Sequence, residues 1–452
     1  MYYTASVGFA HGQLPYRDFL LLHPPGIVLA LAPFAWVGGV IGDFKATVLS
    51  QVTFMLLGAA SAVLVSWMLR SSGWAASLVG GLVYAVALPS VYAESSTWLE
   101  APGSFFMLLG MALIITVPPD RPLTVKRVLI AGIALGISPT FKIWTIVPAL
   151  AVVAWLLFTR HWSVAAWTSL GGSIGIGGVM LPFFASAPMA MWQMVVTDQL
   201  GRPVVRPNPA MRMDMILGFR LDEEAVWSPR LIALCAVLVV AALIALASRV
   251  GRFAVVMSGV TITVLLASPS WYNHYPTLAT GPLAMVVGVA FGLVAGSLPR
   301  ARWTVPLAVA LVVATLAGYT SEVVVYRRKA AVFDAAALAQ VATDRPGCVT
   351  ANLPIALINN GLLRRNLARG CPVMADFRGY YYHLRTPGEA LPSRRKSTLY
   401  QQFAIDYLGS GTLAVIMDEA EQSFDATTLA TIHGWPIVVG IGQDYVREPT
   451  PR

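Results

Sequence analysis

Apolar stretches without any charged side chain recur along most of the chain. They cover 46–69, 73–93, 101–119, 163–185, 231–248, 253–273, 275–299 and 303–320. A hydrocarbon core about 30 Å thick requires roughly 20 apolar residues per helical span. A further stretch, 128–159, is interrupted once at Pro139–Lys142, and we interpret it as two spans joined by a turn. The pattern predicts an α-helical polytopic membrane protein with about 10–11 spans.

The basic residues between these stretches predict the topology. Lys and Arg occupy every second connection, whereas 94–100 and 270–276 contain neither residue. By the positive-inside rule the basic connections are cytoplasmic and the others are external. The alternation also places the loop 186–230 outside, although it contains five arginines. Five acidic residues balance them, and a folded loop of this length follows the rule weakly.

The N-terminal segment permits two interpretations. Residues 25–41 are apolar but contain Pro33, Gly38 and Gly39. This stretch is either a span or a helix lying on the outer membrane surface, and charge does not decide between them. We therefore divide the chain into three parts. Residues 1–45 form a first external loop with a juxtamembrane helix, residues 46–320 form a transmembrane bundle with the loop 186–230, and residues 321–452 form a soluble domain.

The pattern changes after residue 321. Short β-branched runs at 349–350, 412–417 and 436–440 alternate with helical stretches at 324–343, 354–368, 396–408 and 423–433. This indicates a small α/β domain, which parity places outside the cytoplasm. Cys348 and Cys371 lie in it and are either two free thiols or, as we favour, a disulfide formed in an oxidising compartment.

Composition limits the classes of function. The chain is 57% hydrophobic and 12% charged, which excludes an ordinary soluble domain. A net charge of +9 is explained by basic loops, and no basic stretch carries the features of a nucleic-acid interface. There is no H-E-x-x-H, Cys pair or D-x-D of a metal site, so we expect no metal and no cofactor. Gly171 and Gly172 lie within a span, where small residues allow close helix packing.

The first loop carries a family resemblance. The run Gly12-Gln13-Leu14-Pro15-Tyr16-Arg17-Asp18-Phe19, followed by His23-Pro24-Pro25-Gly26, resembles the first external loop of the GT-C glycosyltransferases. These include the protein O-mannosyltransferases, the aminoarabinose transferases and their actinobacterial relatives. Weaker matches are Gly132–Lys142 and the aromatic run Trp271–Pro276.

The resemblance implies a reaction. A sugar, as in a mannosyltransferase, moves from a polyprenyl-phosphate donor to a glycan, lipid or protein acceptor of the cell envelope, at the external face of the plasma membrane. The acid usually assigned as general base in the family precedes the pair equivalent to Tyr2-Tyr3. We therefore expect this acid, and the span that carries it, upstream of Met1.

This chemistry requires a carboxylate that accepts the acceptor's proton. Asp18 is one candidate, although an Asp18–Arg17 pair that fixes a turn explains it equally. Glu94 is the second candidate, since ionisable groups at span ends are costly unless they are solvated or paired. Acceptor-side candidates are Tyr16, Trp98 and Glu100, and Glu100 alternatively starts a helix as an N-terminal acid.

Cations and polar side chains must also stabilise the leaving phosphate. Lys142 is a candidate as a point charge, or it snorkels to the interface without a role. His274 is a phosphate or sugar ligand, or an interfacial belt residue. The remaining donor-side candidates are Arg17, His23, Arg202 and Tyr275.

Two other functions remain open. A transporter or flippase of envelope lipid precursors predicts ionisable residues in mid-span and inverted halves. A non-catalytic scaffold of envelope assembly is consistent with the absence of the expected acid.

Overall fold

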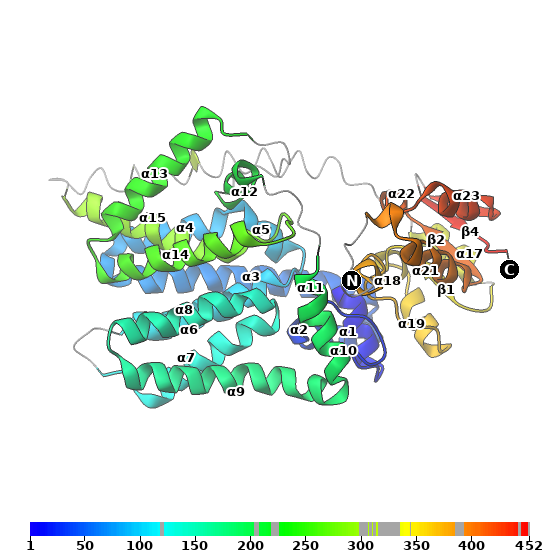
Figure 1. The fold of residues 1–452 in the computed structure, drawn as a ribbon, viewed down its shortest axis with the longest axis horizontal. Helices are drawn as coiled ribbons and strands as arrows, with labels where there is room; N and C mark the ends of the chain where they lie inside the picture. The colour runs from blue at the N-terminus through cyan, green and yellow to red at the C-terminus, as the bar shows by residue number, and fades with distance from the viewer. Residues whose placement is uncertain are drawn as a thin grey trace. The chain divides into compact units, whose positions relative to one another are not determined.

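The computed structural model describes all residues except 118–121, 203–207, 218–225, 298–305, 307–309, 311–312, 315–334, 344, 385–392, 442–443 and 451–452. The chain folds into two compact units (Figure 1). The bundle unit comprises Gln51–Met180 and Val204–Ala330. The sheet unit comprises Met1–Ser50, Leu181–Pro203 and Ala331–Arg452. The predicted division at residues 45 and 320 remains a proposal.

The described helices include four that are long and apolar enough to cross a membrane. These are Asp43–Ser72, Trp162–Ser186, Arg249–Ala267 and Thr277–Ser297. The helices Trp74–Val86 and Leu88–Ser95, bent by 53°, form a fifth if they are one broken span. Gly26–Ile41, Glu100–Ile115, Ile143–Phe158 and Pro229–Ala245 are shorter apolar helices. The predicted multi-pass helical fold is confirmed.

The bundle unit follows the predicted spans closely. Its helices are α4 (Trp74–Val86), α5 (Leu88–Ser95), α6 (Glu100–Ile115), α7 (Val125–Ile137), α8 (Ile146–Phe158), α12 (Pro209–Ile216), α13 (Pro229–Ala245), α14 (Arg249–Ala267) and α15 (Thr277–Ser297), and the unit boundary falls within α3 (Asp43–Leu69) and α9 (Trp162–Ser186). The predicted break in 128–159 is present as two 3₁₀ turns, Ser138–Thr140 and Ile143–Thr145. The span predicted at 303–320 lies almost entirely outside the described residues.

Small residues allow helices in the bundle to approach closely. A Cβ added at Gly136 of α7 would lie 2.0 Å from the carbonyl oxygen of Gly172 in α9. A Cβ added at Gly288 of α15 would lie 2.7 Å from the carbonyl oxygen of Ala76 in α4. In lipid, packing of this kind replaces the hydrophobic effect as the force that holds helices together. The packing role predicted for the glycines of 171–172 is confirmed.

The sheet unit contains a four-stranded mixed sheet. Its strands are β1 (Val349–Ala351), β2 (Leu413–Ile416), β3 (Ile437–Ile441) and β4 (Asp444–Arg447), in the order β1-β2-β4-β3. β1 runs parallel to β2, whereas β4 is antiparallel to both of its neighbours. The sequence predicted three of these strands and missed β4, which has a charged residue at each end and so shows no apolar β-branched run.

Helices from three parts of the chain belong to the sheet unit. They are α1 (Tyr2–Ala10), α2 (Gly26–Ile41), α10 (Pro188–Trp192), the π-helix η4 (Gln193–Thr197), α11 (Asp198–Leu200), α17 (Ala335–Thr343), α18 (Ile355–Ile358), α19 (Leu362–Ala368), α20 (Tyr380–His383), the 3₁₀ turn η6 (Arg394–Lys396), α21 (Thr398–Gly409), α22 (Asp418–Glu421) and α23 (Ala426–Gly434). The helix predicted at 354–368 is interrupted at Gly361, which has a φ of +72°. Of the helix predicted at 324–343, residues 324–334 lie outside the described residues.

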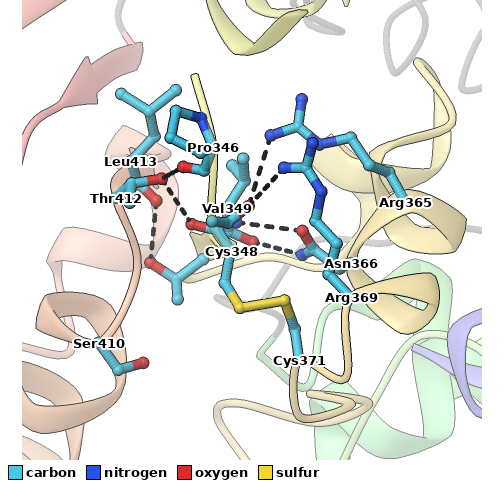
Figure 2. The surroundings of a disulfide bond; sticks show 12 residues. Pro346, Cys348, Val349, Arg365, Asn366, Arg369, Cys371, Ser410, Thr412 and Leu413 are labelled. Atoms are coloured by element: carbon cyan, nitrogen blue, oxygen red, sulfur yellow. Dashed lines mark hydrogen bonds between the residues drawn. A yellow bond between two sulfur atoms is a disulfide. The ribbon is translucent and has the colours of Figure 1, made fainter. Parts of the chain in front are cut away.

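A disulfide bond joins Cys348 to Cys371, as predicted (Figure 2). It connects the start of β1 to the segment that follows α19. Beside it, the Asn366 amide accepts a hydrogen bond from Val349 N at 3.1 Å and donates one to Val349 O at 2.7 Å. The bond and the amide together fix α19 against the edge strand. Cys235, a free cysteine, is partly exposed in α13.

A buried carboxylate ties the N-terminal helices of the sheet unit to α19. The side chain of Asp43 is 0% exposed and accepts hydrogen bonds from Arg364 Nε at 3.0 Å and Arg364 Nη2 at 2.8 Å. Tyr3 donates its hydroxyl to the same carboxylate at 2.8 Å, and Arg364 also binds the carbonyl oxygen of Ala35. Gly38 leaves room for this group, since a Cβ there would lie 2.4 Å from the Tyr3 hydroxyl.

We expect Asp43→Asn to destabilise the sheet unit. The substitution leaves the Arg364 guanidinium partly buried beside a neutral amide, at a cost of roughly 3 kcal/mol in the free energy of unfolding. Thermal unfolding of the purified full chain measures it. Asp18→Asn is the control, because its carboxylate pairs with an exposed arginine and such pairs contribute little. Equal losses in the two variants would contradict a special role for Asp43.

Candidate functional site

A buried ion pair lies at the ends of helices in the bundle unit. Glu100 is the first residue of α6, and Lys142 lies in the break between α7 and α8. Lys142 Nζ lies 3.1 Å from Glu100 Oε1, and the two side chains are 7% and 6% exposed. The structure therefore brings together one predicted donor-side residue and one predicted acceptor-side residue. Removing two charges from water is costly, so such a pair needs close contact and further polar partners.

Aromatic rings surround the ammonium group of Lys142. Its Nζ lies 3.9 Å from the ring centroid of Tyr275 and 4.8 Å from that of Trp144. The two rings meet edge to face, with centroids 4.5 Å apart. Cation–π contacts of this kind strengthen when the site excludes water. The rings thus hold the ammonium group in place beside Glu100.

His274 is the third polar member of this cluster. Its Nε2 lies 3.7 Å from Glu100 Oε1, and its ring stacks on Trp98 with centroids 4.1 Å apart and an interplanar angle of 9°. The pKa of His274 is lowered to about 4, chiefly by burial; the charge of Glu100 opposes this shift and that of Lys142 adds to it. The imidazole is therefore neutral near pH 7 and can both donate and accept a hydrogen bond.

An arginine that the sequence did not single out supports the loop that carries His274. Arg212 of α12 is fully buried, and its Nη1 donates to the carbonyl oxygens of Leu265, Leu266 and Ser268 at 2.7–3.1 Å. These carbonyls end α14, where a cation is favourable. The guanidinium also lies 5.1 Å from the ring centroid of Trp271. Five arginines in one loop gave no signal that this one is structural.

Glu94, predicted as a catalytic acid, has a separate environment on α5. Tyr84 donates its hydroxyl to Glu94 Oε1 at 3.2 Å. The carboxylate packs against bare backbone, since a Cβ added at Gly58 would lie 1.9 Å from Glu94 Oε2. The side chain is buried, and its contacts are consistent with either a structural or a catalytic role.

The predicted residues of the first loop lie in the sheet unit. Asp18 pairs with exposed Arg17 at 2.8 Å and accepts a hydrogen bond from Leu14 N at 2.7 Å. The hydrogen bonds from Arg17 and Leu14, with the charge of Arg17, lower the pKa of the Asp18 carboxyl. Tyr16 is buried with a φ of +70° and donates its hydroxyl to the carbonyl oxygen of His23 at 2.7 Å. His23 is buried edge-on against Tyr2. These contacts fit a rigid loop, and a catalytic role for Asp18 remains a prediction.

Arg202 of the sheet unit lies beside a pair that sequence reasoning missed. Its guanidinium carbon is 4.6 Å from the ring centroid of Tyr382 in α20. Next to it, His383 Nδ1 lies 3.0 Å from Asp198 Oδ2, and the Asp198 side chain is 1% exposed. His383 follows three consecutive tyrosines, a run that shows no recognisable motif. Among the described residues, no group of three His, Cys, Asp or Glu side chains is arranged to hold a metal ion.

The depressed pKa of His274 predicts how stability varies with pH. The unfolded imidazole binds a proton as the pH falls through about 6.5, whereas the folded imidazole binds one only near pH 4. Protonation therefore favours the unfolded state, and the free energy of unfolding decreases as the pH falls from 6.5 to 4. The loss amounts to roughly 3 kcal/mol. Thermal unfolding of the full chain from pH 7 to 4 should show a shallower decline in His274→Gln than in the wild type. Parallel curves would contradict the assigned environment.

Comparisons with known proteins identify the fold. No model of a protein family and no curated protein matches the chain. Two solved structures match, both of ArnT from Cupriavidus metallidurans, one bound to undecaprenyl phosphate and the other in the apo state. Each has a TM-score of 0.61 and 16% sequence identity over 99% of this chain, and the matches cover 93% and 92% of the ArnT chains. As the first-loop motif indicated, the chain has the fold of the GT-C glycosyltransferases.

Proposed function

We propose that this protein is a membrane glycosyltransferase that moves a sugar from a polyprenyl-phosphate donor to an acceptor hydroxyl of the cell envelope. The fold supports it, because the similar ArnT structure contains undecaprenyl phosphate. The first-loop motif further favours a hexose, as in a mannosyltransferase. The alternation of basic connections supports reaction at the external face of the plasma membrane. The disulfide supports an extracytoplasmic position for residues 321–452.

The buried Lys142–Glu100 pair is the observation that carries this proposal. A sugar transfer of this type produces a lipid phosphate and requires removal of a hydroxyl proton, so it needs a cation and a carboxylate at one place. Lys142 supplies the cation, and Glu100 supplies the carboxylate 3.1 Å away. His274, being neutral, can donate a hydrogen bond to the sugar or to the phosphate without adding charge.

Glu100 and Lys142 have separate roles in a single displacement at the anomeric carbon. The acceptor oxygen attacks the anomeric carbon while its proton moves to the Glu100 carboxylate. A bond forms between the acceptor oxygen and the anomeric carbon, and the bond from that carbon to the phosphate oxygen breaks. The leaving polyprenyl phosphate takes the electron pair, and Lys142 offsets the charge that develops on it. Before the reaction, the ion pair keeps both groups compensated.

The other predicted residues have supporting roles in this proposal. Arg202, which is held over Tyr382, and Arg17 and His23 remain donor-side candidates within the sheet unit. Trp98 and Tyr275 support the polar cluster, because Trp98 stacks on His274 and the face of Tyr275 contacts the Lys142 ammonium group. Tyr16 positions the first loop through its hydrogen bond to His23. Asp18 and Glu94 are the alternative acids.

Transfer by the full chain in lipid nanodiscs tests this function. With a radiolabelled polyprenyl-phosphate hexose and total envelope lipids and glycans as acceptor, we expect label to enter the acceptor fraction. Glu100→Gln should reduce the rate at least 100-fold, since general base catalysis contributes about 10²–10⁴-fold. Asp406→Asn, at an exposed position on α21, is the matched control.

Because Glu100→Gln leaves Lys142 buried without its carboxylate, its thermal unfolding is measured alongside transfer. In the folded variant, binding of the donor should remain near that of the wild type, since Lys142 is still present. If Glu94→Gln or Asp18→Asn abolishes transfer while Glu100→Gln does not, the acid is misassigned. Absence of transfer by the wild type with donors of several hexoses would contradict the enzyme and favour the scaffold or transporter.

A further inference from the structure

Helix α2 of the sheet unit carries apolar side chains on two opposite faces. The buried face contains Ile27, Leu31, Ala35 and Gly38. The exposed face contains Leu29, Trp36, Val37 and Val40. Both sets follow the helical period, and on the second face Val40 is 88% exposed and Trp36 58% exposed. Large apolar side chains gathered on one exposed face mark a surface that contacts another apolar medium.

Hydrogen bonds from two helices hold the buried face of α2. Ser6 of α1 donates its hydroxyl to the carbonyl oxygen of Val28 at 3.1 Å. Arg364 of α19 donates to the carbonyl oxygen of Ala35 and, through Nε, to the carboxylate of Asp43 at 3.0 Å. Figure 1 shows α1 and α2 next to one another. The orientation of α2 relative to α1 and α19 is therefore fixed.

The contact with Arg364 argues against a membrane span at α2. Ala35 lies about 9 Å from the C-terminal end of the helix, so a span would place its carbonyl oxygen well inside the hydrocarbon. The guanidinium of Arg364 would then lie there too, with Arg365 and Asn366 of the same short helix close by. Charged and amide side chains are costly at that depth. A helix of 16 residues is also only about 24 Å long, shorter than the hydrocarbon core.

The membrane nevertheless reaches the end of α2. Gly42 alone separates Ile41 from the candidate span Asp43–Ser72. Its φ of +93° interrupts the helix at that point, which glycine permits without strain. Phe44, in the first turn of that span, is exposed as well. Because the span begins within two residues of α2, the C-terminal turn of α2 must lie at the bilayer surface.

We propose that α2 lies along the bilayer surface, inserts its exposed apolar face among the lipids and anchors the sheet unit to the membrane. Helices of this kind bury their apolar face about 5–10 Å into the boundary between headgroups and acyl chains. A tryptophan such as Trp36 is favoured at that level. Since Arg364 joins α2 to α19, the anchor also keeps α19 close to the headgroups. This inference does not rest on the proposed reaction.

Fluorescence quenching by spin-labelled lipids tests the orientation of α2. The full chain is placed in phosphatidylcholine nanodiscs with a bimane label on Leu29→Cys, Trp36→Cys or Val40→Cys. Each variant also carries Cys235→Ser, because the other two cysteines are joined in the disulfide. The nitroxide is carried either on the lipid headgroup or near the end of the acyl chain. All three labels should be quenched at least about twofold more by the headgroup nitroxide, because they share one shallow depth.

Two control positions calibrate the measurement. Leu56→Cys is exposed near the middle of the candidate span Asp43–Ser72, so the acyl-chain nitroxide should quench its label more strongly. Leu399→Cys is exposed on α21 of the sheet unit and should be quenched weakly by both lipids. Val37→Cys, on the same exposed face, replaces Trp36→Cys if that variant does not fold.

Two results would overturn the proposal. Stronger quenching of the Trp36→Cys label by the acyl-chain nitroxide would show that α2 crosses the membrane. Quenching at all three positions as weak as at Leu399→Cys would show that protein, from this chain or a second copy, covers the exposed face.

Discussion

The central constraint on this structure is the cost of removing Lys142 and Glu100 from water. A lone buried charge at a helix end is costly, so the bundle must keep the two groups in contact. The rings of Trp144 and Tyr275 and the neutral imidazole of His274 complete the environment. Arg212 contributes indirectly, because it caps α14 immediately before the loop that carries His274. In the proposed reaction, the donor phosphate is a second anion for Lys142.

The sheet unit also contains a buried charge, which is compensated by an arginine and a hydroxyl group. Asp43 is fully buried and is compensated by Arg364 and by the hydroxyl of Tyr3, while the disulfide closes the segment that carries Arg364. These contacts join α1, α2 and the start of α3 to α19, a helix more than 300 positions later in the chain.

Much of the fold was predictable because each helix that crosses a membrane requires one long, continuous apolar stretch. Each predicted span from 46–69 to 275–299 contains a described helix, and Cys348 and Cys371 form the expected disulfide. The site was only partly predictable. Lys142 and His274 were singled out, but their common partner Glu100 was expected on the acceptor side, because sequence shows which residues are ionisable and not which ones meet. Arg364 and His383 gave no local signal, since their partners Asp43 and Asp198 are far away in the chain.

The most direct measurement is an experimental structure of the full chain in nanodiscs with a polyprenyl phosphate bound. The account predicts a phosphate oxygen within about 3 Å of Lys142 Nζ, hydrogen-bond distance, with the Glu100 carboxylate facing the space where the sugar and acceptor meet. A phosphate held elsewhere, with the Lys142–Glu100 pair closed and sealed from lipid, would contradict it.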